Sequence, residues 1–489
     1  MSIDERIRHG LHAETPPSLD LDRELGRVMA RRARRRRHER IGLVSVVLIV
    51  TFALVTAGLV VAAHRDDHAS PLRALNVPRD QLVIPGPDAT LAAANLPRAG
   101  AASPDVASLV HDNTVFAFDL YHRLAAGRSD NLFLSPESIS TTLGMAYVGA
   151  KSNTATEIAS ALHFTLDPTR LHDAFNALNQ TLLAPRPTSA RIGGQPLELE
   201  IDNSLWAQRG RDFIKTFLDT LAADYGAPVH LVDYAASPTA AVDAINAYVA
   251  TQTKGRIPKL VSADDIDTLT RFVLLNTVYF KGSWTVPFQA SEAATLFHLL
   301  DGTTVNPTMM TADEPLDVAQ TDAYQAVRIP YVGGASMRLI IPAAGQFDQV
   351  ESRLGGDVLD QIRSTESTQS IRLTMPKFSF SSSARLDDAL KALGMRDAFV
   401  PPTTTGGADF SAMGPTRDLY LKTVVHQATV AVDEQGTEAT AATAATGETE
   451  SAHPVSQSLT IDRPFLVVIE DDATHAVLFT GRVTNPNHH

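Results

Sequence analysis

The chain has 489 residues, of which 44% are apolar and 20% are charged, a composition typical of a globular protein with a sizeable core. Its formal net charge of −13 lacks the basic excess of nucleic-acid-binding proteins, so we expect no nucleic-acid partner. The absence of cysteine excludes disulfides, thiolate nucleophiles and cysteine metal ligands.

The first predicted element is a membrane-spanning helix over residues 41–63. This segment, IGLVSVVLIVTFALVTAGLVVAA, carries no charge, and a helix needs about 20 apolar residues to cross the hydrocarbon core. Arginines crowd residues 31–40 just ahead of it, and such charge stays in the cytoplasm, so we expect residues 1–40 to form a cytoplasmic tail. A cleaved signal peptide is the alternative, but the length of the preceding segment and of the apolar run favours a retained anchor.

Residues 64–106 follow as a predicted tether between membrane and folded body. They are rich in Ala, Pro, Leu and Asp, and no apolar period of 2 or 3.6 residues persists along them. A single folded domain is predicted over 107–487. Its first half shows helical spacing, as in Val115, Phe118 and Tyr121, and its second half is rich in strand-like runs. This order favours an α+β domain with large, mostly antiparallel sheets.

The sequence carries no recognisable catalytic motif. The patterns G-x-S-x-G, H-E-x-x-H, G-x-G-x-x-G and G-x-x-x-x-G-K-[ST] are all absent from it. His426 lies inside an apolar strand pattern and is interpreted as structural, and Ser451 has no His or Asp partner at a recognisable spacing. We therefore predict no enzymatic activity, no metal site and no cofactor.

The stretch 433–454, DEQGTEATAATAATGETESAHP, lies between two strand-like runs yet contains no large apolar side chain. Such strings are usually flexible linkers, but side chains alternate between the faces of a strand, and every charge from residue 438 onward falls on one face, at Glu438, Glu448 and Glu450. Burying an unpaired carboxylate is prohibitive, so the pattern predicts a loop that can also become a strand with its carboxylates in water. The opposite face would hold Thr437, Ala439, Ala441, Thr443, Ala445, Gly447 and Thr449.

These residues belong to a recognisable pattern, because DEQGTEATAATAAT (433–446) resembles the hinge of the reactive loop in serpins, the serine protease inhibitor family. The resemblance runs through 107–487. It implies the serpin fold, with three β-sheets, eight or nine helices and an exposed reactive-centre loop. The predicted transmembrane helix precedes this fold and falls outside the family pattern. The other motifs that carry it are NLFLSPESISTTLGMAYVGAKSNTATEI, INAYVATQTKGRIPKLV, LLNTVYFKGSWTVPF, LTMPKFSFSSSARLDDALKALGMRDAF, ADFSAM and RPFLVVIEDDATHAVLFTGRVTNP.

The resemblance implies an inhibitor that acts as a suicide substrate. A serine protease attacks one loop bond and forms an acyl ester, and the cut loop inserts into the main sheet before water releases the enzyme. The family's loop length, counted from Glu434, places this bond at Glu450–Ser451, which suits a glutamyl-specific protease. Ala445–Thr446 or Thr446–Gly447 would instead suit an elastase- or subtilisin-like enzyme. The implied hinge comprises Glu434, Gly436, Thr437, Glu438, Ala439, Thr440, Ala441, Ala442 and Thr443.

The resemblance also assigns residues that gate the main sheet. Asn276 and His426 resemble the pair that bridges its central strands. Ser135 and Ser138 resemble the small polar residues beneath that pair, in the region that opens for the loop. Trp284 resembles the tryptophan where insertion begins. All five positions are expected to control insertion rather than catalysis.

The hinge composition favours an inhibitory member of the family. Its residues are small and uncharged on the face that would be buried, whereas non-inhibitory relatives tend to carry bulky or charged ones. The alternative is a non-inhibitory, binding or chaperone-like protein with a cleavable loop. Arginine far outnumbers lysine and alanine is abundant, which favours a GC-rich bacterial genome. We expect a monomer in the cell membrane, with a single pass and an extracytoplasmic serpin domain.

Overall fold

The computed structural model describes the residues 82, 83, 98, 103–184, 186, 197–403, 406–437 and 457–488. All of them belong to one compact unit that spans Pro71–His489. In these ranges no helix is long and apolar enough to cross a membrane. The predicted membrane segment, 41–63, lies outside the described residues, as does the predicted reactive bond Glu450–Ser451.

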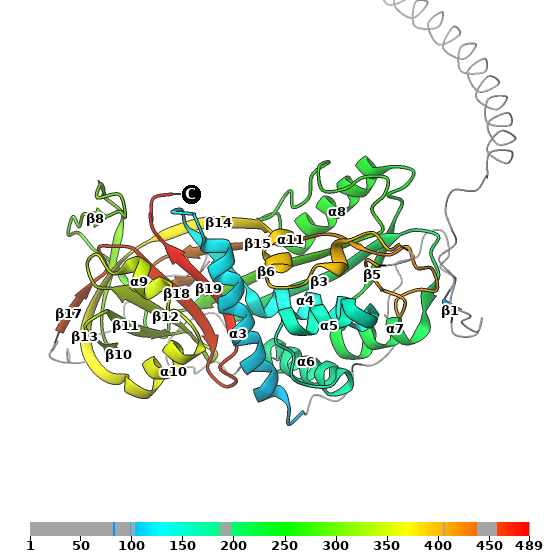
Figure 1. The fold of residues 1–489 in the computed structure, drawn as a ribbon. Coiled ribbons are helices and arrows are strands. Elements are labelled where there is room, and N and C mark those ends of the chain that lie inside the picture. The colour runs from blue at the N-terminus through cyan, green and yellow to red at the C-terminus, as the bar shows by residue number, and fades with distance from the viewer. Residues whose placement is uncertain are drawn as a thin grey trace, which may run out of the picture. The chain divides into compact units, whose positions relative to one another are not determined.

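Helices dominate the first half of the unit, as predicted (Figure 1). Several begin where a proline follows a polar residue, because proline is pre-organised for the first helical position; Pro136, Pro168 and Pro238 each occupy such a start. The helices of the described part are α3 (Val106–Ala125), α4 (Pro136–Gly149), α5 (Ser152–Ala161), α6 (Pro168–Leu183), α7 (Lys215–Thr220), the π-helical η2 (Leu221–Tyr225), α8 (Pro238–Gln252), α9 (Phe347–Glu351), α10 (Gly356–Thr365), α11 (Asp387–Ala392) and the short 3-10 helix η3 (Asp397–Phe399).

A six-stranded sheet contains the start of the predicted reactive loop. Its order is β14 (Phe378–Arg385), β15 (Leu421–Val432), β16 (Gly436–Thr437), β6 (Phe272–Ser283), β3 (Glu198–Gln208) and β5 (Val229–Val232). The two faces of β6 bury alternate residues in different cores: Val273 and Leu275 pack with α8, whereas Leu274 joins the core that contains α4. The sheet therefore lies between α8 on one side and α4 with its neighbours on the other (Figure 1).

A nine-stranded sheet supplies the rest of the β-structure. Its long strand β10 (Met309–Gln320) pairs with β13 (Ser367–Pro376) along most of its length and with β11 (Tyr324–Pro330) at its end. Strand β10 therefore joins two sets of strands, one on the β13 side and one on the β11 side, into a single continuous sheet. Counted separately, these two sets and the six-stranded sheet make up the three sheets predicted. The remaining strands of this sheet are β17 (Gln457–Thr460), β12 (Ala335–Pro342), β18 (Phe465–Asp471), β19 (Val477–Val483), β2 (Leu132–Leu134) and, beside β10, β7 (Gln289–Ala290).

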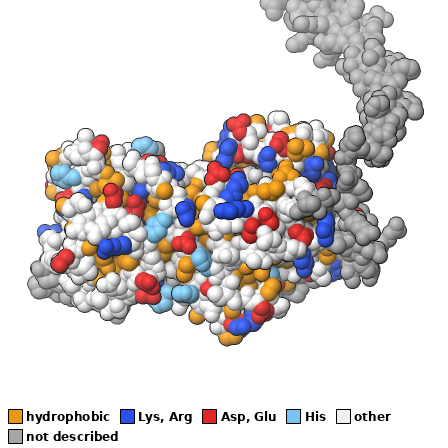
Figure 2. All heavy atoms as spheres, in the orientation of Figure 1, with side chains coloured by type: hydrophobic (Ala, Val, Ile, Leu, Met, Phe, Trp, Pro, Cys, Tyr) orange, Lys and Arg blue, Asp and Glu red, His pale blue; other side chains and the backbone are white. Residues whose placement is uncertain are grey.

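Two further ladders have two strands each. One joins β8 (Phe297–His298) to β9 (Thr304–Val305). The other joins β1 (Leu82–Val83) to β4 (Phe213–Ile214), so it connects the segment that precedes α3 to the folded domain. On the face drawn in Figure 2, acidic and basic side chains are interspersed, in keeping with the many ion pairs of this unit.

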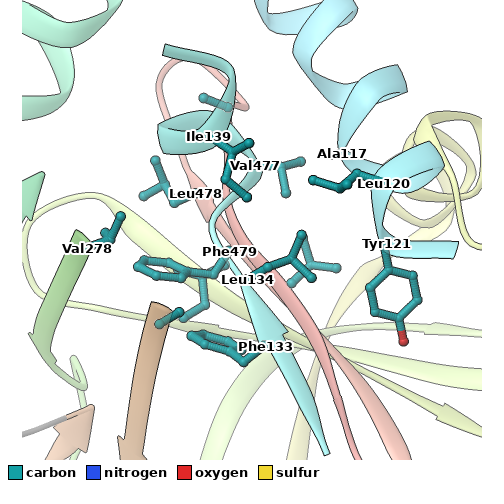
Figure 3. Packing of buried hydrophobic residues seen from close by; sticks show 14 of the residues in the cluster. Ala117, Leu120, Tyr121, Phe133, Leu134, Ile139, Val278, Val477, Leu478 and Phe479 are labelled. Carbon is teal, nitrogen blue, oxygen red and sulfur yellow. The ribbon is translucent and has the colours of Figure 1, made fainter. Parts of the chain in front are cut away.

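The main core lies where α3 and α4 cross β2 and β19 (Figure 3). Leu120 of α3 and Ile139 of α4 point towards Phe479 of β19 and Phe133 of β2, and the two phenyl rings stack with centroids 5.0 Å apart. Nearly every residue of α4 is buried, its serines and threonines included. A helix buried on all sides needs internal partners for its polar side chains. The partners of Ser138 and Thr142 lie on the six-stranded sheet, whereas Ser140 donates to Asn113 of α3.

Candidate functional site: the loop hinge and the sheet that receives it

The hinge of the predicted reactive loop is built into the six-stranded sheet. After β15 ends, the Asp433 carboxylate accepts hydrogen bonds from the backbone N–H groups of Gln435 (2.8 Å) and Gly436 (3.2 Å), which closes a tight turn. The chain then reverses, and Thr437 pairs with Val432 of β15 on one side and with Gly282 of β6 on the other. The first two residues of the predicted inserting strand therefore already lie between β15 and β6.

The two strands on either side run parallel to each other and converge below the hinge. Their direct pairing extends from Leu421 opposite Phe272 to Ala428 opposite Val278, and β16 occupies the gap above it. A segment that turns back from β15 is antiparallel to both neighbours, as β16 is. Each further residue that enters would replace part of one parallel ladder with two antiparallel ones, which add main-chain hydrogen bonds and are slightly more stable per residue.

Thr437 is sealed into its position. The residue is 1% exposed, and its hydroxyl shares a 2.6 Å hydrogen bond with the phenol of Tyr331. Tyr331 is fully buried, and burial raises the pKa of its phenol well above the ordinary value, so the group stays protonated and can donate. Its ring stacks on the indole of Trp284 with centroids 4.4 Å apart. The first inserted side chain thus fits a closed space with room for a threonine.

Trp284, which is fully buried, holds the turn through two hydrogen bonds. Its indole N–H donates to the carbonyl oxygen of Asp433 (2.9 Å), and its backbone N–H donates to the carbonyl oxygen of Gln435 (3.0 Å). Glu434 adds an ion pair with Lys377, 2.5 Å between nitrogen and oxygen. The prediction that Trp284 lies where insertion begins is consistent with these contacts.

Gly436 is the hinge position that most requires glycine. Its φ of +152° is rarely adopted by residues with a side chain, and a Cβ atom there would lie 1.9 Å from the carbonyl oxygen of Gly282. Because Gly436 has no side chain, its backbone can approach that of Gly282 closely enough for the turn to join the sheet. A side chain at this position would therefore force the hinge out of the gap.

A second polar cluster lies under the paired part of β15 and β6. His426 of β15 is buried, its Nε2 accepts a hydrogen bond from the backbone N–H of Ser135 (3.1 Å), and its Nδ1 donates to the side-chain oxygen of Asn276 on β6 (2.7 Å). Burial lowers the pKa of His426 to about 3, so the ring is neutral at physiological pH and needs both partners. The predicted pairing of His426 with Asn276 is present, and it links the two strands that the loop would separate.

Asn276 also connects the sheet to the buried helix α4. Its amide nitrogen donates to the hydroxyls of Ser138 and Thr142 and, at 2.7 Å, to the side-chain oxygen of Asn203 on β3. Thr142 donates to the same Asn203 oxygen at 2.8 Å. The network therefore spans β15, β6, β3 and α4, and opening the sheet must rearrange it.

The structure brings together the predicted residues Ser135, Ser138, Asn276 and His426 in this cluster. It places Trp284 with Glu434, Gly436 and Thr437 at the hinge. Sequence reasoning missed Tyr331, Lys377, Asn203 and Thr142, whose partners are far away in the chain. The remaining predicted loop residues lie outside the described residues: Glu438, Ala439, Thr440, Ala441, Ala442, Thr443, Glu450 and Ser451.

A buried carboxyl group on α4 gives the domain a pH dependence. Glu137 is 2% exposed, burial raises its pKa to about 7, and one of its oxygens accepts a 3.0 Å hydrogen bond from Thr141. The unfolded chain would lose this proton near its ordinary value of 4.5. Above that pH the unfolded state binds fewer protons than the folded state, so the free energy of unfolding decreases as the pH rises towards 7.

The variant Glu137→Gln is expected to remove this loss, because a neutral amide keeps the acceptor for Thr141. At about pH 8 its free energy of unfolding should exceed that of the wild type by up to about 3 kcal/mol, from 1.4 kcal/mol for each unit of pKa shift. Thermal midpoints of both proteins measured at pH 5 and pH 8 would check this. An equal difference between the two proteins at both values would contradict it.

Comparison with known proteins fits this geometry. A family model described as Serpin (serine protease inhibitor) matches residues 111–486. A serpin-like protein of Thermococcus kodakarensis is 36% identical over 375 residues, which cover 76% of this chain and 84% of that protein. The leukocyte elastase inhibitor of Bos taurus is 32% identical over 386 residues, which cover 76% and 98%. The structure of human thyroxine-binding globulin matches with a TM-score of 0.70 at 28% identity, over 78% of this chain and 100% of that one. The chain therefore belongs to the serpin family.

Proposed function

We propose that this serpin inhibits a serine protease by trapping it as an acyl enzyme. The observation that carries the proposal is the position of Thr437, which is buried between β15 and β6 as the first residue of an inserting strand. A loop that is only cleaved and does not insert would not need a closed space between the strands that fits a small side chain and offers it Tyr331 as a hydrogen-bond partner.

The proposed reaction is cleavage interrupted at its midpoint. The protease serine oxygen attacks the carbonyl carbon of Glu450, the Glu450–Ser451 bond breaks, and the new amino group of Ser451 leaves with a proton. The ester that remains links the protease to the loop, which then enters the gap between β15 and β6. Insertion must be faster than hydrolysis of the ester. A hinge that already lies in the sheet should make insertion faster.

The scissile bond sets the class of target. Glu450 before the bond suits a glutamyl-specific protease with a cationic or histidine-lined pocket. Cleavage at Ala445–Thr446 or Thr446–Gly447 would suit an elastase- or subtilisin-like enzyme. The apolar segment 41–63 would anchor the inhibitor in a bacterial cell membrane by a single pass, with the serpin domain on the outer side. The inhibitor would act as a monomer.

A panel of serine proteases with different specificities tests the proposal. Incubation with the target is expected to give an SDS-stable species at the summed mass of protease and inhibitor, together with a released peptide that begins at Ser451. A peptide that begins at Thr446 or Gly447 would move the bond but keep the mechanism.

Clean cleavage by every protease, without a stable complex, would overturn the inhibitory proposal. It would favour the non-inhibitory alternative, in which the domain binds another molecule and its loop is simply cut. Human thyroxine-binding globulin, 28% identical to this chain, carries a ligand-binding function in its name.

A further inference from the structure

The segment that precedes the serpin domain makes specific contacts with that domain. Leu82, Val83 and Arg98 all lie ahead of residue 111, where the match to the family model begins. We infer that these three residues occupy an intramolecular docking site on the domain, built by β4, α6 and η2. The inference is independent of the proposed inhibition, because it concerns how the domain is attached rather than what it traps.

The first contact is a strand added to a short edge. Leu82 pairs with Ile214 and Val83 with Phe213, antiparallel. The other side of β4 is already occupied, because the Ile214 backbone N–H donates to the carbonyl oxygen of Met413 (3.0 Å). The β1 residues therefore take the free edge of β4, which is the way an extended peptide binds a sheet.

The second contact is a guanidinium group inserted between two helices. Arg98 donates from Nε and Nη2 to the side-chain oxygen of Asn176 on α6, at 3.1 and 3.0 Å. Its Nη2 also donates to the backbone carbonyl oxygen of Asp224 in η2, at 3.1 Å. Burial lowers the pKa of Arg98, and attraction to Asp224 opposes that shift. Burying part of a guanidinium costs free energy unless it is hydrogen-bonded. The three hydrogen bonds of Arg98 offset this cost and favour the docked position.

The docking site also has a shape that admits the arginine. Gly226 ends η2 with φ +61°, and a Cβ atom at this position would lie 2.3 Å from Nη1 of Arg98. Any other residue would need both a left-handed backbone and a displaced guanidinium. Gly226 therefore serves the helix end and the arginine at once, which indicates a built site rather than chance contact.

Docking at β4, α6 and η2 can occur only when these elements are folded together. A contact made by the native state and not by the unfolded chain stabilises the native state. The contacts of Leu82, Val83 and Arg98 thus link this part of the chain to the integrity of β4, α6 and η2.

Hydrogen exchange on the full-length chain in detergent tests this inference. In Arg98→Ala, peptides that cover 80–100 and 213–226 are expected to exchange at least about tenfold faster than in the wild type, because a hydrogen bond to a charged group is worth at least this factor. Asn176→Ala should have the same effect from the other side of the bond. In the double variant the effects should not add, since both changes remove one interaction.

Limited proteolysis provides a second measurement and separates docking from folding. An arginine-specific cysteine protease should cut after Arg98 faster in Asn176→Ala than in the wild type, while the thermal midpoint of the domain falls only slightly. Wild-type exchange rates at 80–100 and 213–226 in Arg98→Ala, or additive effects in the double variant, would overturn the inference. Neither result depends on whether a protease is trapped.

Discussion

The variant Thr437→Arg is expected to convert the protein from an inhibitor into a substrate. Thr437 is 1% exposed between β15 and β6, and its hydroxyl is bound to Tyr331, so an arginine would be an unpaired charge in a closed space. The effective cost of burying such an ion is several kcal/mol. Since insertion competes with ester hydrolysis, a barrier raised by about 3 kcal/mol would shift the outcome roughly a hundredfold towards release.

The stoichiometry of inhibition and the yield of SDS-stable complex measure this shift. The matched control is Gln435→Arg, which adds the same charge two residues earlier at a half-buried position whose side chain is not enclosed in the sheet. This control should still form complexes. Undiminished inhibition by Thr437→Arg would contradict insertion through this gap, and equal loss in both variants would indicate a general effect of charge near the hinge.

Cleavage of the loop is expected to raise the thermal midpoint of the domain by about 20 °C. Thr437 is already paired, so insertion of residues 438–450 would form the new main-chain hydrogen bonds, and at about 1 kcal/mol net for each residue the gain is on the order of 10 kcal/mol. In a domain of this size 1 kcal/mol corresponds to about 2 °C. The intact protein would therefore be a kinetically trapped state whose loop is released by a single cut.

A protease that is not trapped, such as a metalloprotease that cuts close to Glu450, would prepare the cleaved form for calorimetry. Cleaved Thr437→Arg provides the control, because its loop should enter poorly and its midpoint should rise much less. Identical midpoints for intact and cleaved wild type would show that no energy is stored, and the inhibitory proposal would fail with it.

Much of the fold was predictable because local patterns and global structure agree. Helical spacing around Val115 and Phe118 corresponds to α3, and the strand-like runs after residue 271 correspond to the strands of the two large sheets. The sheet count was harder to predict, because β10 is one strand that belongs to two ladders. Continuity of that kind depends on register between distant segments, which the spacing of apolar residues does not encode.

The candidate site was predictable only in part, and the reason lies in sequence separation. The hinge is local, so its alternating small residues identified Thr437 as an inward position, and the resemblance supplied His426 and Asn276. Tyr331 is 106 residues from Thr437, and its own surroundings show an ordinary buried tyrosine. Asn203 likewise has no local signal that would assign it to Asn276. Partners of this kind become visible only once the strands are placed side by side.

The stacking of Trp284 on Tyr331 gives the molecule an internal optical probe. The chain has two tryptophans, and the other, Trp206, stacks on His230 with ring centroids 4.4 Å apart, in the core under α8. With Trp206 replaced by phenylalanine, emission would come from a single indole that touches the turn at Asp433. Departure or deeper entry of the loop would alter the polarity around this indole, so its kinetics can be followed in real time without a label.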